Sequence, residues 1–198
     1  MSIERFDLRH IAPQPWKNGA GLTREIALAE SSIGGFDWRI SLAEVERDAP
    51  FSAFPGIDRC IVLLRGAGMR LRSADGRVDH RLTEQLLPFH FAGDDVLDAT
   101  LIAGPCSDFN VMTRRGAFRS EVSCHRAAAE LPGADVTLLL CCEGEWGVET
   151  GTPQVLHPMQ ALLWHAPLAS IAVRPVRPVL AGEPAALLLV RLCHDRSA

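Results

Sequence analysis

The chain has 198 residues, of which 47% are hydrophobic and 22% charged, so it can bury a core and is not intrinsically disordered. Its formal net charge of −4 excludes a generally basic nucleic-acid binder, although a local basic patch stays open. No apolar run approaches the roughly 20 residues of a membrane span, and the N-terminal residues lack the apolar segment of a signal peptide. We therefore expect a soluble, cytoplasmic protein with one large domain or two small ones.

Alternation of apolar and polar residues dominates the chain and predicts an all-β fold. Residues 36–42 alternate throughout, which is typical of a half-buried strand. Residues 60–64 form a continuous apolar run that ends at a glycine-containing turn, after which Met69 and Leu71 resume the alternation. Further strands are predicted at residues 22–30, 96–103, 108–113, 136–142, 146–150, 161–165, 171–174 and 186–192.

Helical patterns are rare. Residues 127–131 predict one turn of helix that Pro132 ends, and residues 49–54 predict a loop or a single helical turn. Short strands separated by Gly and Pro, of which the chain has 16 and 13, indicate a sandwich or barrel.

A faint internal repeat runs along the chain. Residues 63–66 read Leu-Leu-Arg-Gly, and residues 141–144, which read Cys-Cys-Glu-Gly, follow them by 78 positions. Both copies continue as strand, turn and strand. The period is too long for a solenoid and suits two small β units in tandem.

Several blocks resemble the HutD/Ves family, in the expected order over residues 13–115. The opening block is Pro-Trp-Lys-Asn-Gly-Ala-Gly-Leu-Thr-Arg-Glu-Ile at residues 15–26, and the second is Phe-Asp-Trp-Arg-Ile-Ser at residues 36–41. The other blocks lie at residues 48–59, 91–94, 104–105 and 108–115. Residues beyond 115 resemble the family only in their strand pattern.

This resemblance implies a bicupin, which is two jelly-roll barrels packed together in one chain. We expect an N-terminal cupin at residues 1–115 that carries the family motifs and a C-terminal cupin at residues 116–198, packed as one compact body. The resemblance links the protein to bacterial histidine utilisation through HutD and to stress-induced expression through Ves. It assigns no biochemical activity.

Cysteine and histidine spacing argues against a metal. The six Cys include no C-x-x-C pair, so we expect six free thiols that behave mainly as small buried hydrophobes. Many cupins hold a metal through His-x-His, and this motif is absent among the seven His. We therefore expect no metal and no cofactor.

Two predicted strands carry polar residues on one face. Asp37, Arg39 and Ser41 share a face of the strand at 36–42, and Asp108 and Asn110 share a face of the strand at 108–113. If these faces point into a barrel they line a ligand cavity, and if they point outward they form an ordinary solvated surface. The sequence leaves both arrangements open.

The candidate site is rich in positive charge. Arg offers a planar fork to a carboxylate, and Lys17, the only Lys among 20 basic residues, offers a point charge. Asn side chains can donate and accept hydrogen bonds to a ligand amide or imidazole, and Asp108 could orient an Arg or bind a ligand N–H. The rival reading is structural, in which Asp37, Asp58 and Asp108 tie the Arg residues into ion pairs. The predicted ligand-binding residues are Trp16, Lys17, Asn18, Arg39, Ser41, Arg59, Asp108, Asn110 and Arg114.

The sequence therefore predicts a metal-independent protein that binds a small carboxylate and modulates histidine utilisation. The alternative is an acid–base enzyme, an isomerase or hydrolase, with Asp108 or His90 as the base. We expect the partner to be a small anionic metabolite, with an intermediate of histidine breakdown as a candidate. We expect no nucleic-acid or membrane partner, and a homodimer stays open.

Overall fold

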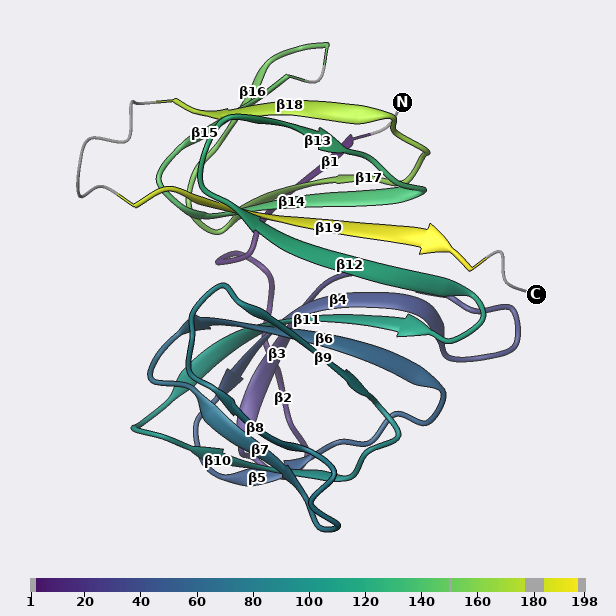
Figure 1. The fold of residues 1–198 in the computed structure, drawn as a ribbon, viewed down its shortest axis with the longest axis vertical. Coiled ribbons are helices and arrows are strands. Elements are labelled where there is room, and N and C mark those ends of the chain that lie inside the picture. The colour runs from purple at the N-terminus through teal and green to yellow at the C-terminus, as the bar shows by residue number, and fades with distance from the viewer. Residues whose placement is uncertain (1–2, 150, 177–183, 196–198) are drawn as a thin grey trace. The chain divides into compact units, whose positions relative to one another are not determined.

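The computed structural model describes residues 3–149, 151–176 and 184–195, all of them in strands, turns or loops (Figure 1). These residues form two compact units. The N-terminal unit comprises residues 11–119 together with Asp195, and the C-terminal unit comprises the described residues among 3–10 and 120–194. The described residues include no helix long and apolar enough to cross a membrane.

The N-terminal unit contains two antiparallel sheets. The six-stranded sheet has the order β2-β3-β4-β11-β6-β9, and the four-stranded sheet has the order β5-β10-β7-β8. Their strands are β2 (Gln14–Pro15), β3 (Gly21–Glu30), β4 (Phe36–Val45), β5 (Ala49–Phe51), β6 (Ile57–Arg65), β7 (Met69–Ser73), β8 (Asp79–Leu82), β9 (Pro88–Ala92), β10 (Leu97–Leu101) and β11 (Cys106–Arg114).

The C-terminal unit repeats this plan with a five-stranded sheet, β1-β17-β14-β19-β12, and a four-stranded sheet, β13-β18-β15-β16. Its strands are β1 (Ile3–Asp7), β12 (Phe118–His125), β13 (Ala129–Pro132), β14 (Val136–Glu143), β15 (Trp146–Glu149), β16 (Gln154–Leu156), β17 (Gln160–Trp164), β18 (Ser170–Pro175) and β19 (Ala186–His194).

The two units share one connectivity. Strands β4 to β11 of the N-terminal unit correspond in chain order to strands β12 to β19 of the C-terminal unit. The sheet order β4-β11-β6-β9 then matches β12-β19-β14-β17, and β5-β10-β7-β8 matches β13-β18-β15-β16. This arrangement of eight strands in two facing sheets is the jelly roll. The all-β fold and the tandem repeat predicted from the sequence are therefore confirmed.

A backbone detail supports the correspondence. Leu86 and Met159 are the two non-glycine residues with positive φ among those described, at 64° and 69°. Each lies in the turn before the corresponding strand, β9 or β17. The N–H of Leu86 donates to the carbonyl of Leu63 at 2.9 Å, and the N–H of Met159 donates to the carbonyl of Cys141 at 2.8 Å. The same strained turn is thus closed in the same way in both units.

Three strands lie outside the shared plan. In the N-terminal unit, β3 pairs with the edge of β4, and the short β2 pairs with β3. In the C-terminal unit, β1 pairs with β17 along its whole length, from Ile3 opposite Trp164 to Asp7 opposite Gln160 (Figure 1). The predicted domain division placed residues 1–115 together, whereas pairing with β17 places the first described residues with the C-terminal unit.

Two local predictions were wrong. Residues 127–131 were predicted as a helical turn and instead enter β13, and residues 49–54 were predicted as a loop or helical turn and begin with β5. Pairing of β13 with β18, and of β5 with β10, supplies backbone hydrogen bonds that local propensity does not reveal. Residue 150, the end of the strand predicted at 146–150, lies outside the described residues.

Candidate functional site

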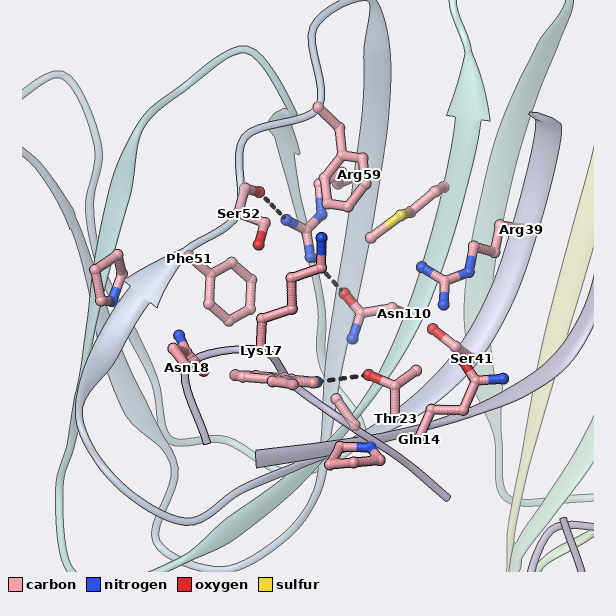
Figure 2. Close-up of a pocket in the computed structure, with 16 residues that line it drawn as sticks. Gln14, Lys17, Asn18, Thr23, Arg39, Ser41, Phe51, Ser52, Arg59 and Asn110 are labelled. Atoms are coloured by element: carbon pink, nitrogen blue, oxygen red, sulfur yellow. Dashed lines mark hydrogen bonds between the residues drawn. The ribbon is translucent and has the colours of Figure 1, made fainter. Parts of the chain in front are cut away.

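A pocket opens into the interior of the N-terminal unit (Figure 2). Its volume is about 390 Å³, and it lies against the inner faces of β3, β4, β6 and β11, with the turn that joins β2 to β3 and the segment after β5 as further walls. The lining residues are Gln14, Pro15, Trp16, Lys17, Asn18, Thr23, Arg39, Ser41, Ala43, Pro50, Phe51, Ser52, Phe54, Arg59, Asn110 and Met112.

The pocket forms because the inner faces of the strands change from polar to apolar along their length. On β4 the inward positions run from Arg39 and Ser41 to Val45, and on β6 they run from Arg59 to Leu63. The apolar ends join the buried cluster between the two sheets of this unit. The polar ends lie outside this cluster and border the pocket. The polar faces that the sequence left open therefore point inward.

The turn between β2 and β3 positions three of the predicted residues. The indole N–H of Trp16 donates to the Thr23 hydroxyl at 2.7 Å, which anchors the ring in the pocket wall. The Asn18 side-chain oxygen accepts the Ala20 N–H at 3.0 Å and so closes a local turn. A Cβ at Gly21 would lie 2.3 Å from the carbonyl oxygen of Glu44, so only glycine permits this approach of β3 to β4.

Arg59 is the most constrained cation of the pocket, with 5% of its surface exposed. Its guanidinium donates to the Ser52 carbonyl at 3.2 Å and to Asn110 Oδ1 at 2.9 Å, while its buried Nε–H has no partner. It also lies 4.7 Å from the ring centre of Phe51, and 5.4 and 5.0 Å from the centres of two further Phe rings, Phe54 and Phe91.

The environment of Arg59 affects its charge only modestly. Burial lowers the pKa of Arg59 to about 10, the nearby Asp108 carboxylate opposes that shift, and the Arg39 charge adds to it. The guanidinium therefore stays positively charged at neutral pH. It is held rigidly by hydrogen bonds and aromatic faces, which makes it a preorganised binding group.

Asp108 lies behind the pocket wall and is fully buried. Asn110 joins it to Arg59, because the Asn110 amide donates to Asp108 Oδ1 and its oxygen accepts from Arg59. Asp108 Oδ2 has no hydrogen-bond partner. Burial raises the pKa of Asp108 to about 7, and the Arg59 charge and the Asn110 hydrogen bond only partly oppose that rise.

The other two cations of the pocket are less confined. Arg39 uses its Nε–H to donate to Glu25 on β3 at 2.8 Å, which leaves the rest of its fork on the pocket side. Lys17 is exposed at its backbone turn, and its side chain extends into the pocket (Figure 2). Ser41 is buried, and its hydroxyl lines the cavity.

The lining therefore carries a clear charge imbalance. Lys17, Arg39 and Arg59 contribute three positive charges, and none of the described lining residues is Asp or Glu. The lining also contains no His or Cys, and nowhere among the described residues do three His, Cys, Asp or Glu side chains gather as a metal site would require. The cavity is suited to a small anion and does not fit the metal that many cupins hold.

Seven of the nine predicted ligand-binding residues line this one pocket, namely Trp16, Lys17, Asn18, Arg39, Ser41, Arg59 and Asn110. Asp108 lies one layer behind it. Arg114 lies outside the lining and donates to the Asp37 carboxylate at 2.9 Å. His90, the other candidate base, is exposed on β9 and does not line the pocket.

Ion pairing of the kind proposed as a rival explanation occurs at one of the predicted site residues, Arg114, but not between Asp58 and Arg59. Asp37 pairs with Arg114, and Asp58 pairs with Arg115 instead of Arg59. These pairs leave the cations of the pocket free to meet a ligand, apart from the single contact of Arg39 with Glu25.

Sequence reasoning missed the aromatic and hydroxyl part of the lining. Thr23, Phe51, Ser52 and Phe54 belong to blocks that carry the family resemblance, at residues 15–26 and 48–59. Their position within these blocks was the one signal in the sequence that could have identified them as lining residues. Residues 49–54 were predicted as a loop or a single helical turn, and this pattern does not indicate which of their side chains face a cavity.

Comparison with known proteins identifies the family and the fold. The family model described as HutD matches residues 9–179. The structure of HutD from Pseudomonas fluorescens SBW25, determined in a formate condition, is 28% identical with a TM-score of 0.84, and the match covers 98% of this chain and 100% of that one. A conserved protein of unknown function from Pseudomonas aeruginosa PAO1 is also 28% identical, with the same coverage and a TM-score of 0.83.

More distant structures share the fold alone. A cupin 2 conserved barrel domain protein from Leptotrichia buccalis is 10% identical with a TM-score of 0.57, over 94% of this chain and 95% of that one. The two jelly rolls are thus of the cupin kind.

Proposed function

The chain belongs to the HutD family, which is linked to histidine utilisation, and on that basis we propose that it binds a small carboxylate metabolite without a metal and so modulates histidine utilisation. The observation that carries the proposal is the charge of the pocket. Among the described residues three cations line it and no acidic side chain does. Glu25 and Asp108 lie behind Arg39 and Arg59, so the cavity itself presents positive charge that favours an anion.

The donor set suits a carboxylate in particular. Arg59 and Arg39 offer planar forks that can hold both oxygens of a carboxylate, and Lys17 offers a compact charge from the turn between β2 and β3. A cavity of about 390 Å³ falls within the range of small-molecule sites. Asn18, Ser41 and Asn110 add neutral polar groups that can recognise an amide or imidazole on the same ligand.

The related HutD structure was determined in a formate condition, and formate is the smallest carboxylate. We use it as the first probe for this reason. An intermediate of histidine breakdown is the candidate physiological ligand, since such intermediates combine a carboxylate with a polar nitrogen group. We further propose a cytoplasmic protein that has neither nucleic acid nor membrane as its partner, in keeping with a net charge of −4.

Binding has more support than acid–base catalysis. A catalytic base must lie within hydrogen-bond reach of the proton that it removes. Asp108 has a suitable pKa of about 7 but is fully buried behind Asn110, and His90 lies outside the pocket. The groups that face the cavity are donors and cations, which hold an anion without turning it over.

The test is thermal unfolding and calorimetric titration with formate and a panel of carboxylates from histidine breakdown. A ligand at 100 times its dissociation constant should add about 2.7 kcal/mol to the free energy of unfolding. Lys17→Ala and Arg39→Ala should each weaken binding by about tenfold or more, as expected when a charged partner of a bound anion is lost. Arg77→Ala is the matched control, because Arg77 is an exposed arginine of the same unit outside the pocket.

Two results would contradict the proposal. One is that no carboxylate of the panel binds. The other is that the two pocket variants bind as tightly as the Arg77 variant.

A further inference from the structure

The buried carboxyl of Asp108 has too few hydrogen-bond donors around it to stabilise its ionised form fully. Its Oδ2 atom is enclosed and has no hydrogen-bond donor, although its Oδ1 atom accepts from Asn110. A carboxylate oxygen that is buried without a donor loses its hydration and gains nothing in return. Protonation removes the negative charge and with it most of that cost. The site therefore favours a protonated Asp108 when the one cation near it pairs with another anion.

That cation is Arg59, which lines the pocket and can contact a ligand anion there. Asn110 connects the two, since its oxygen accepts from Arg59 at 2.9 Å and its amide donates to Asp108. In the empty pocket the guanidinium charge stabilises the Asp108 carboxylate. A ligand carboxylate at Arg59 brings a second negative charge to the same cation. Two carboxylates at one site repel each other, so keeping both ionised costs free energy.

We propose that the pocket takes up one proton together with each carboxylate that it binds, and that Asp108 receives this proton. The inference rests on the proposed function, because it requires a carboxylate at Arg59. No bond is made or broken except that between the proton, supplied by the solvent, and an Asp108 oxygen. The protein would then bind its ligand more tightly as the pH falls.

The other groups around Asp108 leave it as the one that titrates. From β6 it meets Arg59, and Cys106 on its own strand has a pKa raised to about 12, mainly by burial, so that this thiol stays protonated. From β4 and β3 the charged groups are Arg39 and Glu25, which pair with each other. The facing sheet contributes the apolar cluster of Met69, Leu71, Leu97 and Ala99.

The direction of the effect follows from linkage. Burial raises the pKa of Asp108 in the empty protein to about 7, and a bound anion would raise this pKa further. Below about pH 7 Asp108 is protonated both with and without the ligand, so its titration does not change the affinity. Above that value, binding requires proton uptake, and affinity falls by up to about tenfold for each pH unit.

The experiment is calorimetric titration of formate, which stays ionised throughout, into the whole chain from pH 6.5 to 8.5. We expect the dissociation constant of the wild type to rise by about 20-fold over this range, most of it above pH 7. At pH 8, titration in HEPES and in Tris, whose ionisation enthalpies differ, should report uptake of close to one proton per formate. Asp108→Asn, which mimics the neutral acid, should bind formate with an affinity that is nearly independent of pH.

Asp58→Asn is the matched control, because Asp58 lies beside Arg59 on β6 but pairs with the exposed Arg115 outside the pocket. It should keep the full pH dependence and proton uptake. Formate binding with no proton uptake by the wild type would overturn this inference and leave the proposed function intact, whereas absence of any carboxylate binding would overturn both. The wild-type measurement alone can overturn the proton uptake, so the inference stays falsifiable even if the Asp108 variant fails to fold.

Discussion

The two barrels of this chain have the same connectivity, but the N-terminal barrel encloses a charged cavity and the C-terminal barrel encloses an apolar core. Leu63 and Cys141 occupy the same position of the internal repeat. Strand register places Asp108 opposite Leu63 on the β6–β11 pair, and Leu187 opposite Cys141 on the β14–β19 pair, so Asp108 corresponds to Leu187. Asn110 in the N-terminal unit therefore corresponds to Leu189 in the C-terminal unit, and Arg59 corresponds to Thr137.

In the C-terminal unit these positions are filled without charge. Leu187 and Leu189 join a buried cluster that includes Trp146 and Trp164, both almost completely enclosed. Thr137 satisfies its hydroxyl locally, by accepting the Ala134 N–H at 3.0 Å. The same strands thus build a dry core in one unit and a charged cavity in the other.

The C-terminal unit fills the corresponding positions with packed apolar side chains, so the fold itself does not require the charged cavity of the N-terminal unit. Buried charges stabilise less than well-packed apolar side chains of similar volume, and their retention is often explained by function. The extra hairpin of β2 and β3, which has no counterpart among the described strands of the C-terminal unit, supplies part of the pocket wall. Both differences lie in the unit that carries the family motifs.

Removing the packed aromatic core of the C-terminal unit should have the largest effect on stability. Trp146→Ala deletes a fully buried ring and should lower the free energy of unfolding by about 3–5 kcal/mol, because a large cavity remains. Urea unfolding measures this change, and Val155→Ala on the neighbouring β16, which is exposed, should shift stability by less than about 0.5 kcal/mol. A loss below about 1 kcal/mol for the Trp146 variant would show that this core is loosely packed.

Placing the C-terminal residue into the N-terminal barrel should break the site. Arg59→Thr leaves Asp108 buried without its cation, so we expect a loss of about 3 kcal/mol in stability and of more than tenfold in carboxylate affinity. Adding Asp108→Asn should recover much of the stability but none of the affinity. If the single variant binds formate normally, Arg59 is not the anchor of the anion.

The charged interior should also appear in the dependence of stability on pH. The pKa of Asp108 is raised in the folded state, to about 7 from its ordinary value of 3.8, so the folded chain binds more protons than the unfolded chain between these values. The free energy of unfolding should therefore fall as the pH rises from about 4 to 7, by up to about 1.4 kcal/mol per unit, and Asp108 should contribute no further slope above 7.

Comparing the wild type with Asp108→Asn isolates this contribution in denaturant titrations at several pH values. The variant should lack this part of the slope. Exposed carboxylates such as Asp75 and Asp94 have lowered pKa values and act in the opposite direction, at more acidic pH. Parallel curves for the two proteins between pH 4 and 7 would mean that Asp108 is already ionised in that range.

The smallest expected effect concerns Arg114, which the sequence assigned to the site and the structure places outside its lining. Arg114→Ala removes a half-buried ion pair with Asp37 and should cost about 0.5–1 kcal/mol in stability. Carboxylate affinity, measured beside that of Arg39→Ala, should change by less than about twofold. A loss as large as that of the Arg39 variant would restore Arg114 to the site.

Much of the fold could be read from local pattern. Alternation at residues 36–42 reports a strand directly, and the match between residues 63–66 and 141–144 marks corresponding ends of β6 and β14. The family blocks indicated the fold and contain most of the pocket lining, although the sequence assigned only seven of the 16 lining residues to the site. These signals are local in the chain because side-chain alternation and turn chemistry act between near neighbours.

Other features depended on partners that are distant in the chain. β5 and β13 are short and lack a clear alternation, and they become strands because β10 and β18 supply their hydrogen bonds. β1 joins the C-terminal unit by pairing with β17, more than 150 residues away, and no local pattern encodes that choice.

The site divides in the same way. The sequence by itself determined that Arg39 and Ser41 share one face of a strand, and that Lys17 stands alone among arginines. Only the tertiary structure decided that this face points inward, that Asp108 lies behind Asn110, and that Arg114 belongs to an ion pair. Strand alternation fixes which side chains share a face, but burial of that face depends on which sheet packs against it.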